Sequence, residues 1–98
     1  RQSQVTLFGI ILLFEKNKQQ IFTGEIYELY KKLCLKTDLR PLTQRRISDI
    51  LGELDMLGII NARVISKGRY GRTREIKSDL SFSLRKKIKA ILSHELNI

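Results

Sequence analysis

The sequence has 98 residues, a length that suits one domain with one hydrophobic core. Apolar residues make up 42% of it, which is too many for a disordered chain, and its formal net charge is +9. A domain this basic is biased towards polyanions such as nucleic acids or acidic membranes. The single cysteine, Cys34, excludes an internal disulfide and fits a reducing compartment. We expect it to be a small buried apolar residue.

The first apolar segment, Val5 to Phe14, is too short for a membrane span, which needs about 20 residues, and it lacks the basic start of a signal peptide. We expect a helix from Ser3 to about Lys16, with Ser3 as its N-cap. Because it is apolar around most of its circumference, it is either the central core helix or docks one face onto a partner domain. The chain begins at Arg1 rather than at a methionine, so we expect a fragment of a longer protein.

A second helix is expected after the short apolar pair Ile21–Phe22, which we interpret as a brief edge strand. Thr23 is its expected N-cap, and Glu25 lies favourably in the first turn. Pro41 breaks the helical pattern, because proline disfavours helix at the residue before it. Apolar residues recur between these limits at helical spacing, at Ile26, Leu29, Tyr30 and Leu33.

A third helix is predicted over 43–57, with Thr43 as its N-cap and Gly58 as its C-terminal stop. Its apolar residues are spaced to form one buried stripe. The stripe comprises Ile47, Ile50, Leu51, Leu54 and Leu57. Residues on the opposite face are Arg45, Ser48, Asp49 and Gly52.

A hairpin should follow, since Ile59–Ser66 is rich in β-branched residues and Thr73–Lys77 can return as a second strand with Ile76 inward. The tip between them contains two glycines. Residues 63–77 carry six cationic side chains and one carboxylate, so this segment holds +5 of the net charge.

A last helix is expected to open at Asp79 or Ser81. Its predicted buried stripe consists of Leu84, Ile88, Ile91 and Leu92. The resulting order of elements is helix, short strand, helix, helix, strand, wing, strand, helix. This order predicts a winged helix-turn-helix over 1–98, a mainly α single domain with a small β-hairpin (α+β), in which a three-helix core carries the wing and a C-terminal helix.

Three segments carry a family resemblance: 42–51 reads LTQRRISDIL, 53–62 reads ELDMLGIINA and 68–73 reads GRYGRT. Together with Gly24–Tyr27 and Tyr30, they resemble the C-terminal winged-helix domain of the archaeal replication initiators related to origin-recognition complex subunit one and cell division cycle protein six. The resemblance implies double-stranded DNA at origin repeats as the partner, and a cytoplasmic, nucleoid-associated location with no membrane contact. It also implies contacts with an ATPase domain and with other replication proteins.

The resembling proteins carry an AAA+ ATPase before this domain. No G-x-x-x-x-G-K-[ST] phosphate loop occurs in this chain, so we expect ATP and Mg only in an ATPase domain outside it. The chain itself is then expected to hold no cofactor, to be no enzyme and to be a monomer. One histidine and one cysteine offer no catalytic triad or metal cluster.

The polar start of the third helix is the expected reader of base edges in the major groove, since Arg pairs with guanine and Gln with adenine. Thr43 could hold a phosphate at the helix start, and Gly52 could admit the DNA backbone. The wing, 67–72, is expected in the minor groove, as in the resembling family. The candidate DNA-binding residues are Thr43, Gln44, Arg45, Arg46, Ser48, Lys67, Arg69, Tyr70, Gly71, Arg72 and Arg74.

Several of these residues also have simpler interpretations that involve no DNA. Arg45 could pair with Asp49, and Tyr70 could pack over the hairpin. His94 is expected on the surface. The cations of the last helix indicate a solvated face or a second DNA site. They are Arg85, Lys86, Lys87 and Lys89.

Two other functions remain open for the same fold. It could be a protein-interaction winged helix that docks a partner domain, if one face of the first helix stays exposed. It could also be a transcription regulator, because a fold does not fix a function.

Overall fold

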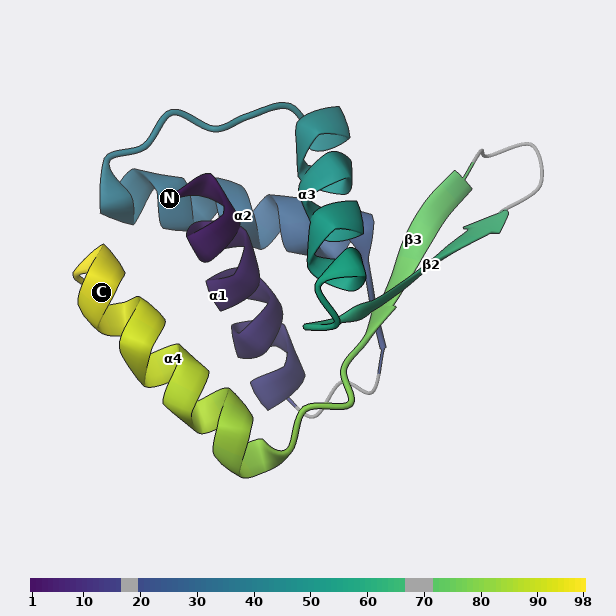
Figure 1. The fold of residues 1–98 in the computed structure, drawn as a ribbon. Helices are drawn as coiled ribbons and strands as arrows, with labels where there is room; N and C mark the ends of the chain where they lie inside the picture. Colours follow the sequence, from purple (N-terminus) through teal and green to yellow (C-terminus); the bar gives the residue numbers. More distant parts are fainter. Residues whose placement is uncertain (17–19, 67–71) are drawn as a thin grey trace.

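The computed structural model describes residues 1–16, 20–66 and 72–98. These residues form four helices and a three-stranded antiparallel sheet, in the predicted order (Figure 1). The elements are α1 (Gln2–Glu15), β1 (Ile21–Phe22), α2 (Thr23–Thr37), α3 (Gln44–Met56), β2 (Asn61–Ser66), β3 (Arg72–Lys77) and α4 (Phe82–Leu96). The predicted α+β class is confirmed.

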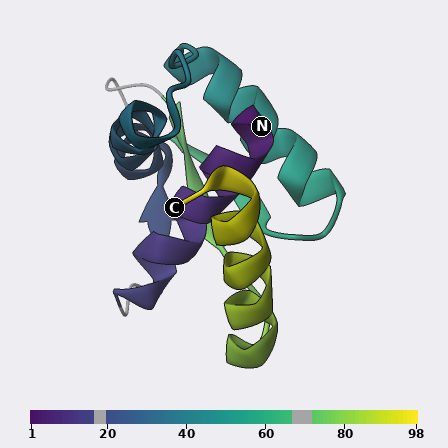
Figure 2. The ribbon, with the colours of Figure 1, turned by 90° about the vertical axis from the view of Figure 1, so that its left-hand side faces the viewer.

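Helix α1 is the centre of the core. It packs against α2, α3 and α4, and α4 covers the side of α1 turned away from α3 (Figures 1 and 2). Residues 5–11 together with Leu13 and Phe14 are all buried. The first of the two interpretations of this helix, the central core helix, is therefore confirmed. No broad apolar face of α1 stays open for a partner.

The start of α1 differs from the prediction. The Val5 N–H donates to the Arg1 carbonyl at 3.0 Å, so the first helical turn begins before Ser3. Arg1 is the N-cap residue, and its side chain makes no capping hydrogen bond. The expectation that Ser3 caps the helix is wrong, because Ser3 already lies inside the first turn.

The sheet has the strand order β1-β3-β2, with β3 in the middle. Ile76 of β3 pairs with Ile21 on one side and with Ala62 on the other, and it is completely buried. The predicted edge strand and the inward Ile76 are both confirmed. Pairing with β1 ties the base of the hairpin to the start of α2.

Thr23 has a different role from the predicted N-cap of α2. It is the first helical residue, and its buried hydroxyl accepts a hydrogen bond from the Arg74 N–H at 3.1 Å and donates to the Arg74 carbonyl at 3.4 Å. Phe22 is the N-cap residue, and its N–H donates to Glu25 Oε1 at 3.2 Å. The Thr23 side chain thus continues the pairing of β3 by one residue beyond β1.

Helix α4 begins after Ser81, whose hydroxyl accepts a hydrogen bond from the Leu84 N–H at 3.1 Å. Its predicted buried stripe is partly wrong, since Leu84 is 43% exposed and Ile91 is 62% exposed. Leu92 is buried as predicted and Ile88 is half-buried, and Leu96 is buried as well. Helix α1 is the main neighbour of α4 and covers only a narrow strip of it. His94 is exposed, as expected.

A hydrogen-bond clamp holds the loop between α2 and α3. The Leu42 N–H donates to the Tyr30 hydroxyl at 2.7 Å, and the Tyr27 hydroxyl donates to the Leu42 carbonyl at 2.9 Å. Tyr30 in turn donates to Gln2 Oε1 at 2.6 Å, and Gln2 Nε2 donates to the Arg40 carbonyl at 3.2 Å. The clamp sets where α3 begins relative to α1 and α2.

Tyr30 is completely buried, and burial raises the pKa of its hydroxyl to about 12 although the hydrogen bond from Leu42 opposes this shift. The neutral phenol is therefore favoured by the folded state. An unfolded tyrosine has a pKa near 10. The contribution of Tyr30 to stability is then complete below pH 10 and is lost as the pH rises from 10 through 12.

Substitution Tyr30→Phe should lower the free energy of unfolding by about 1–3 kcal/mol, because the Leu42 N–H loses its acceptor. Tyr27→Phe should cost less, about 0.5–1.5 kcal/mol, since Tyr27 is only half-buried. Urea denaturation at pH 7 measures both. Repeating it from pH 9 to 12 should show a smaller loss of stability in Tyr30→Phe than in the unsubstituted chain. Parallel pH profiles would contradict the role given to the Tyr30 hydroxyl.

Candidate nucleic-acid interface

Helix α3 begins as predicted. The Thr43 hydroxyl accepts a hydrogen bond from the Arg46 N–H at 3.3 Å, which confirms Thr43 as the N-cap. Its buried residues are Ile47, Ile50, Leu51 and Leu54. Leu57 does not join them. It is 72% exposed, because α3 ends at Met56 and Gly58, with φ +77°, turns the chain towards β2.

The start of α3 presents its polar side chains to solvent. Thr43, Gln44, Arg45 and Arg46 are exposed, and Ser48 is half-buried on the same turn of helix. No ion pair joins Arg45 to Asp49 in the described part of the chain, so the simple pairing expected as an alternative is not formed there. Cationic and amide donors at a helix start are free to meet an external ligand.

Arg74 connects this helix start with the hairpin. It pairs with Val64 across the hairpin and lies on the same face of β3 as the buried Ile76, which turns its side chain towards α3. A shallow polar hollow of about 290 Å³ lies between the two elements. Its lining residues are Thr23, Gln44, Ser48, Val64, Thr73 and Arg74.

Gly52 has a neighbour that the sequence did not suggest. A Cβ at this position would lie 3.9 Å from both terminal nitrogens of Arg74. The space beside Gly52, which we expected to admit a DNA backbone, is therefore next to the guanidinium of Arg74. The guanidinium lies beside the helix here at a distance that an alanine side chain would also allow.

The structure thus brings together six of the predicted site residues. Thr43, Gln44, Arg45, Arg46 and Ser48 occupy the start of α3, and Arg74 reaches the same region from β3. Lys67, Arg69, Tyr70 and Gly71 lie outside the described residues, and only the backbone of Arg72 is described, as the first residue of β3.

Three residues that line the hollow are not among the site residues that the sequence predicts. The sequence indicates a helix cap at Thr23 and ordinary hairpin positions at Val64 and Thr73. Strand alternation places Val64 on the same face as Ala62, and the structure shows that this apolar side chain is 50% exposed. No sequence signal distinguished Thr23, because its role depends on a strand 51 residues away.

The described residues give no indication of a reactive cysteine, a metal site or a membrane span. Cys34 is buried, as predicted, and burial raises the pKa of its thiol, so the reactive thiolate is disfavoured. No group of three or more His, Cys, Asp or Glu in the described ranges could hold a metal ion. Within these ranges no helix is long and apolar enough to cross a bilayer.

A central α1, a helix-turn-helix formed by α2 and α3, and a β2–β3 hairpin beside α3 define a winged helix domain. The family model of the CDC6 C-terminal winged helix domain matches residues 1–87. The chain belongs to this family.

Curated relatives agree with the family. An ORC1-type DNA replication protein of Pyrococcus horikoshii is 59% identical over 80 residues, covering 82% of this chain and 19% of the relative. One from Pyrococcus furiosus is 52% identical over 97 residues, covering 99% and 22%. This chain therefore spans about a fifth of the length of these relatives. The predicted resemblance to the winged-helix domain of archaeal replication initiators is confirmed.

Two solved structures share the fold. The structure of the Aeropyrum pernix ORC1 protein in complex with DNA superposes with a TM-score of 0.78 at 41% identity, covering 96% of this chain and 24% of that one. The crystal structure of Cdc6p from Pyrobaculum aerophilum gives a TM-score of 0.73 at 21% identity, covering 97% and 24%. The second likeness supports the fold alone.

Alanine substitutions at Gly52 and Gly58 should change the stability of the fold in opposite directions. Gly52→Ala should stabilise the fold by about 1 kcal/mol, because 3.9 Å is an ordinary contact and alanine favours helix. Gly58→Ala should destabilise it by about 1–2 kcal/mol, since its φ of +77° strains any residue with a Cβ. Thermal denaturation of both variants checks the signs. A destabilised Gly52→Ala would show that the helix has no room beside Arg74.

Proposed function

We propose that this chain binds double-stranded DNA at replication origins as a monomer. In this proposal, the start of α3 reads base edges in the major groove, and residues 67–72 of the wing enter the minor groove. Arg74, held between α3 and the hairpin, contacts a phosphate where the two meet. The proposal needs no cofactor in this domain, and it leaves ATP and Mg to an ATPase domain elsewhere in the protein.

The observation that carries the proposal is the convergence of cations from two elements on one surface. Arg45 and Arg46 lie exposed at the start of α3, and the Arg74 guanidinium lies beside Gly52 of the same helix. A related protein with the same fold was solved in complex with DNA. Arg and Gln side chains at a helix start suit the donor and acceptor pattern of the major groove.

An exposed apolar face on the first helix would have supported the competing function, the docking of a partner protein domain. The burial of α1 removes that support. A transcription regulator would use the same surface, but the curated relatives are DNA replication proteins.

Fluorescence anisotropy with short duplexes tests the proposal. An AT-rich site that contains an origin repeat is compared with a scrambled site at three salt concentrations. Binding should weaken steeply with salt, since each phosphate contact contributes about −0.9 to the slope of log K against log salt. A preference for the repeat is expected as well. Absence of binding at low salt would reject the proposal.

Gln44→Ala and Arg45→Ala should each flatten the preference for the repeat, by about 1–3 kcal/mol of discrimination for each bidentate contact removed. The exposed positions of both side chains make misfolding of the variants unexpected. Anisotropy on repeat and scrambled duplexes measures the ratio of affinities. If the preference survives in both variants, α3 is not the reader.

Arg74→Ala should instead weaken binding to both duplexes equally and reduce the salt slope by about 1, because a phosphate contact carries no sequence information. Arg63→Ala is the matched control. It removes the same charge from the opposite face of the hairpin, where Arg63 lies across from Glu75 in the strand register. The salt slope of Arg63→Ala should stay unchanged. Equal losses of duplex affinity in Arg74→Ala and Arg63→Ala would mean that binding depends only on the net charge of the domain.

A further inference from the structure

A second surface lies on the other side of the molecule, between the end of α1 and the start of α4. It is a groove of about 500 Å³, larger than the hollow beside α3. Most of its lining comes from one face of α4, at spacings of three and four residues. The lining residues are Phe14, Glu15, Phe82, Arg85, Lys86, Lys89, Ala90 and Ser93.

The groove combines an aromatic lining with a basic rim. Phe14 belongs to the core, whereas Phe82 is 71% exposed although it is a large apolar side chain. The Arg85 guanidinium lies 5.9 Å from the centre of the Phe14 ring. Its Nε is buried and has no hydrogen-bond partner among the described residues. Exposed aromatic surface beside cationic side chains is typical of a binding surface.

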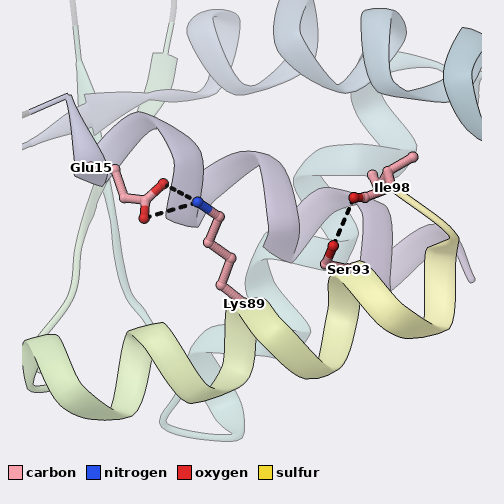
Figure 3. A network of polar contacts seen from close by, with 4 residues as sticks. All are labelled: Glu15, Lys89, Ser93 and Ile98. Atoms are coloured by element: carbon pink, nitrogen blue, oxygen red, sulfur yellow. Dashed lines mark hydrogen bonds and ion pairs between the residues drawn. The ribbon is translucent and has the colours of Figure 1, made fainter.

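Lys89 forms one wall of the groove. Its ammonium group lies 2.8 and 3.1 Å from the two carboxylate oxygens of Glu15 and links α4 to α1 (Figure 3). The sequence had suggested that Arg85 and Lys89 share a solvated face or touch phosphate. Instead both side chains turn towards α1, and Lys86 is left as the exposed cation of the rim.

We propose that this groove binds an acidic amphipathic segment of another protein. A large apolar side chain of that segment would enter between Phe14 and Phe82, and its carboxylates would meet Lys86 and Arg85. The charge supports this partner, because the lining carries three cationic side chains against one carboxylate. The aromatic hollow favours a peptide over a duplex, whose backbone would meet the rim and leave the hollow unfilled.

The position of the groove makes it independent of the proposed DNA interface. In Figure 1, helix α1 lies between α4 on one side and α3 and the hairpin on the other. An acidic segment and a duplex could therefore occupy the domain together. A partner that places its own acidic surface here would not compete with DNA for the start of α3.

The test uses the 98-residue chain and a fluorescein-labelled peptide of sequence EELFEELLEEL, with KKLFKKLLKKL as its charge-reversed control. Two matched pairs of variants separate the groove from the rest of α4. Phe82→Ala is compared with Ile91→Ala, because Ile91 is 62% exposed but does not line the groove. Lys86→Glu is compared with Lys87→Glu, an adjacent exposed lysine outside the lining.

The acidic peptide should bind and the basic one should not. Phe82→Ala should weaken the acidic peptide about tenfold and Lys86→Glu about fivefold, whereas Ile91→Ala and Lys87→Glu should stay within about twofold. Duplex affinity should be the same in Phe82→Ala as in the unsubstituted chain. The absence of peptide binding, or equal effects within either pair, would overturn the proposal. Displacement of the peptide by single-stranded oligo(dT), with weaker oligo(dT) binding in Phe82→Ala, would also overturn it and make the groove a base-stacking site.

Discussion

The hydroxyl groups of Tyr27 and Tyr30 hold both backbone polar groups of Leu42, and the placement of α3 depends on this clamp. Leu42 is the last residue before the Thr43 cap, so the clamp sets the point at which α3 begins. A buried phenol that bonds a backbone N–H is costly to lose, since the N–H would remain unsatisfied. Through Gln2 the same network reaches α1, the helix around which the whole core is built.

A second constraint positions the hairpin against that helix. The Thr23 hydroxyl bonds both backbone groups of Arg74, which fixes β3 at the start of α2. Strand alternation then turns the Arg74 side chain towards α3, where its guanidinium lies beside Gly52. The two elements of the proposed interface are thereby held at one relative position.

The sequence predicted the fold closely where local signals were strong. Thr43 and Gly58 marked α3, and the β-branched run before the glycine-rich tip marked the hairpin. The prediction from the sequence was wrong where long-range packing determines the role of a residue. At Thr23, for example, the hydroxyl bonds the backbone of β3 rather than that of its own helix. Leu84 and Ile91 have helical spacing but face solvent, because periodicity does not tell how wide a strip of α4 the neighbouring α1 covers. The position of Arg74 against Gly52 required the register of the sheet, which no local pattern contains.

The central claim is that duplex DNA meets the start of α3 and the hairpin. Chemical-shift mapping of the ¹⁵N-labelled chain, titrated with a duplex that contains an origin repeat, tests it most directly. The account predicts that the amide signals of residues 43–48 and 72–74 shift together, while those of α4 stay in place. Shifts confined to α4, or no shifts at low salt, would contradict it.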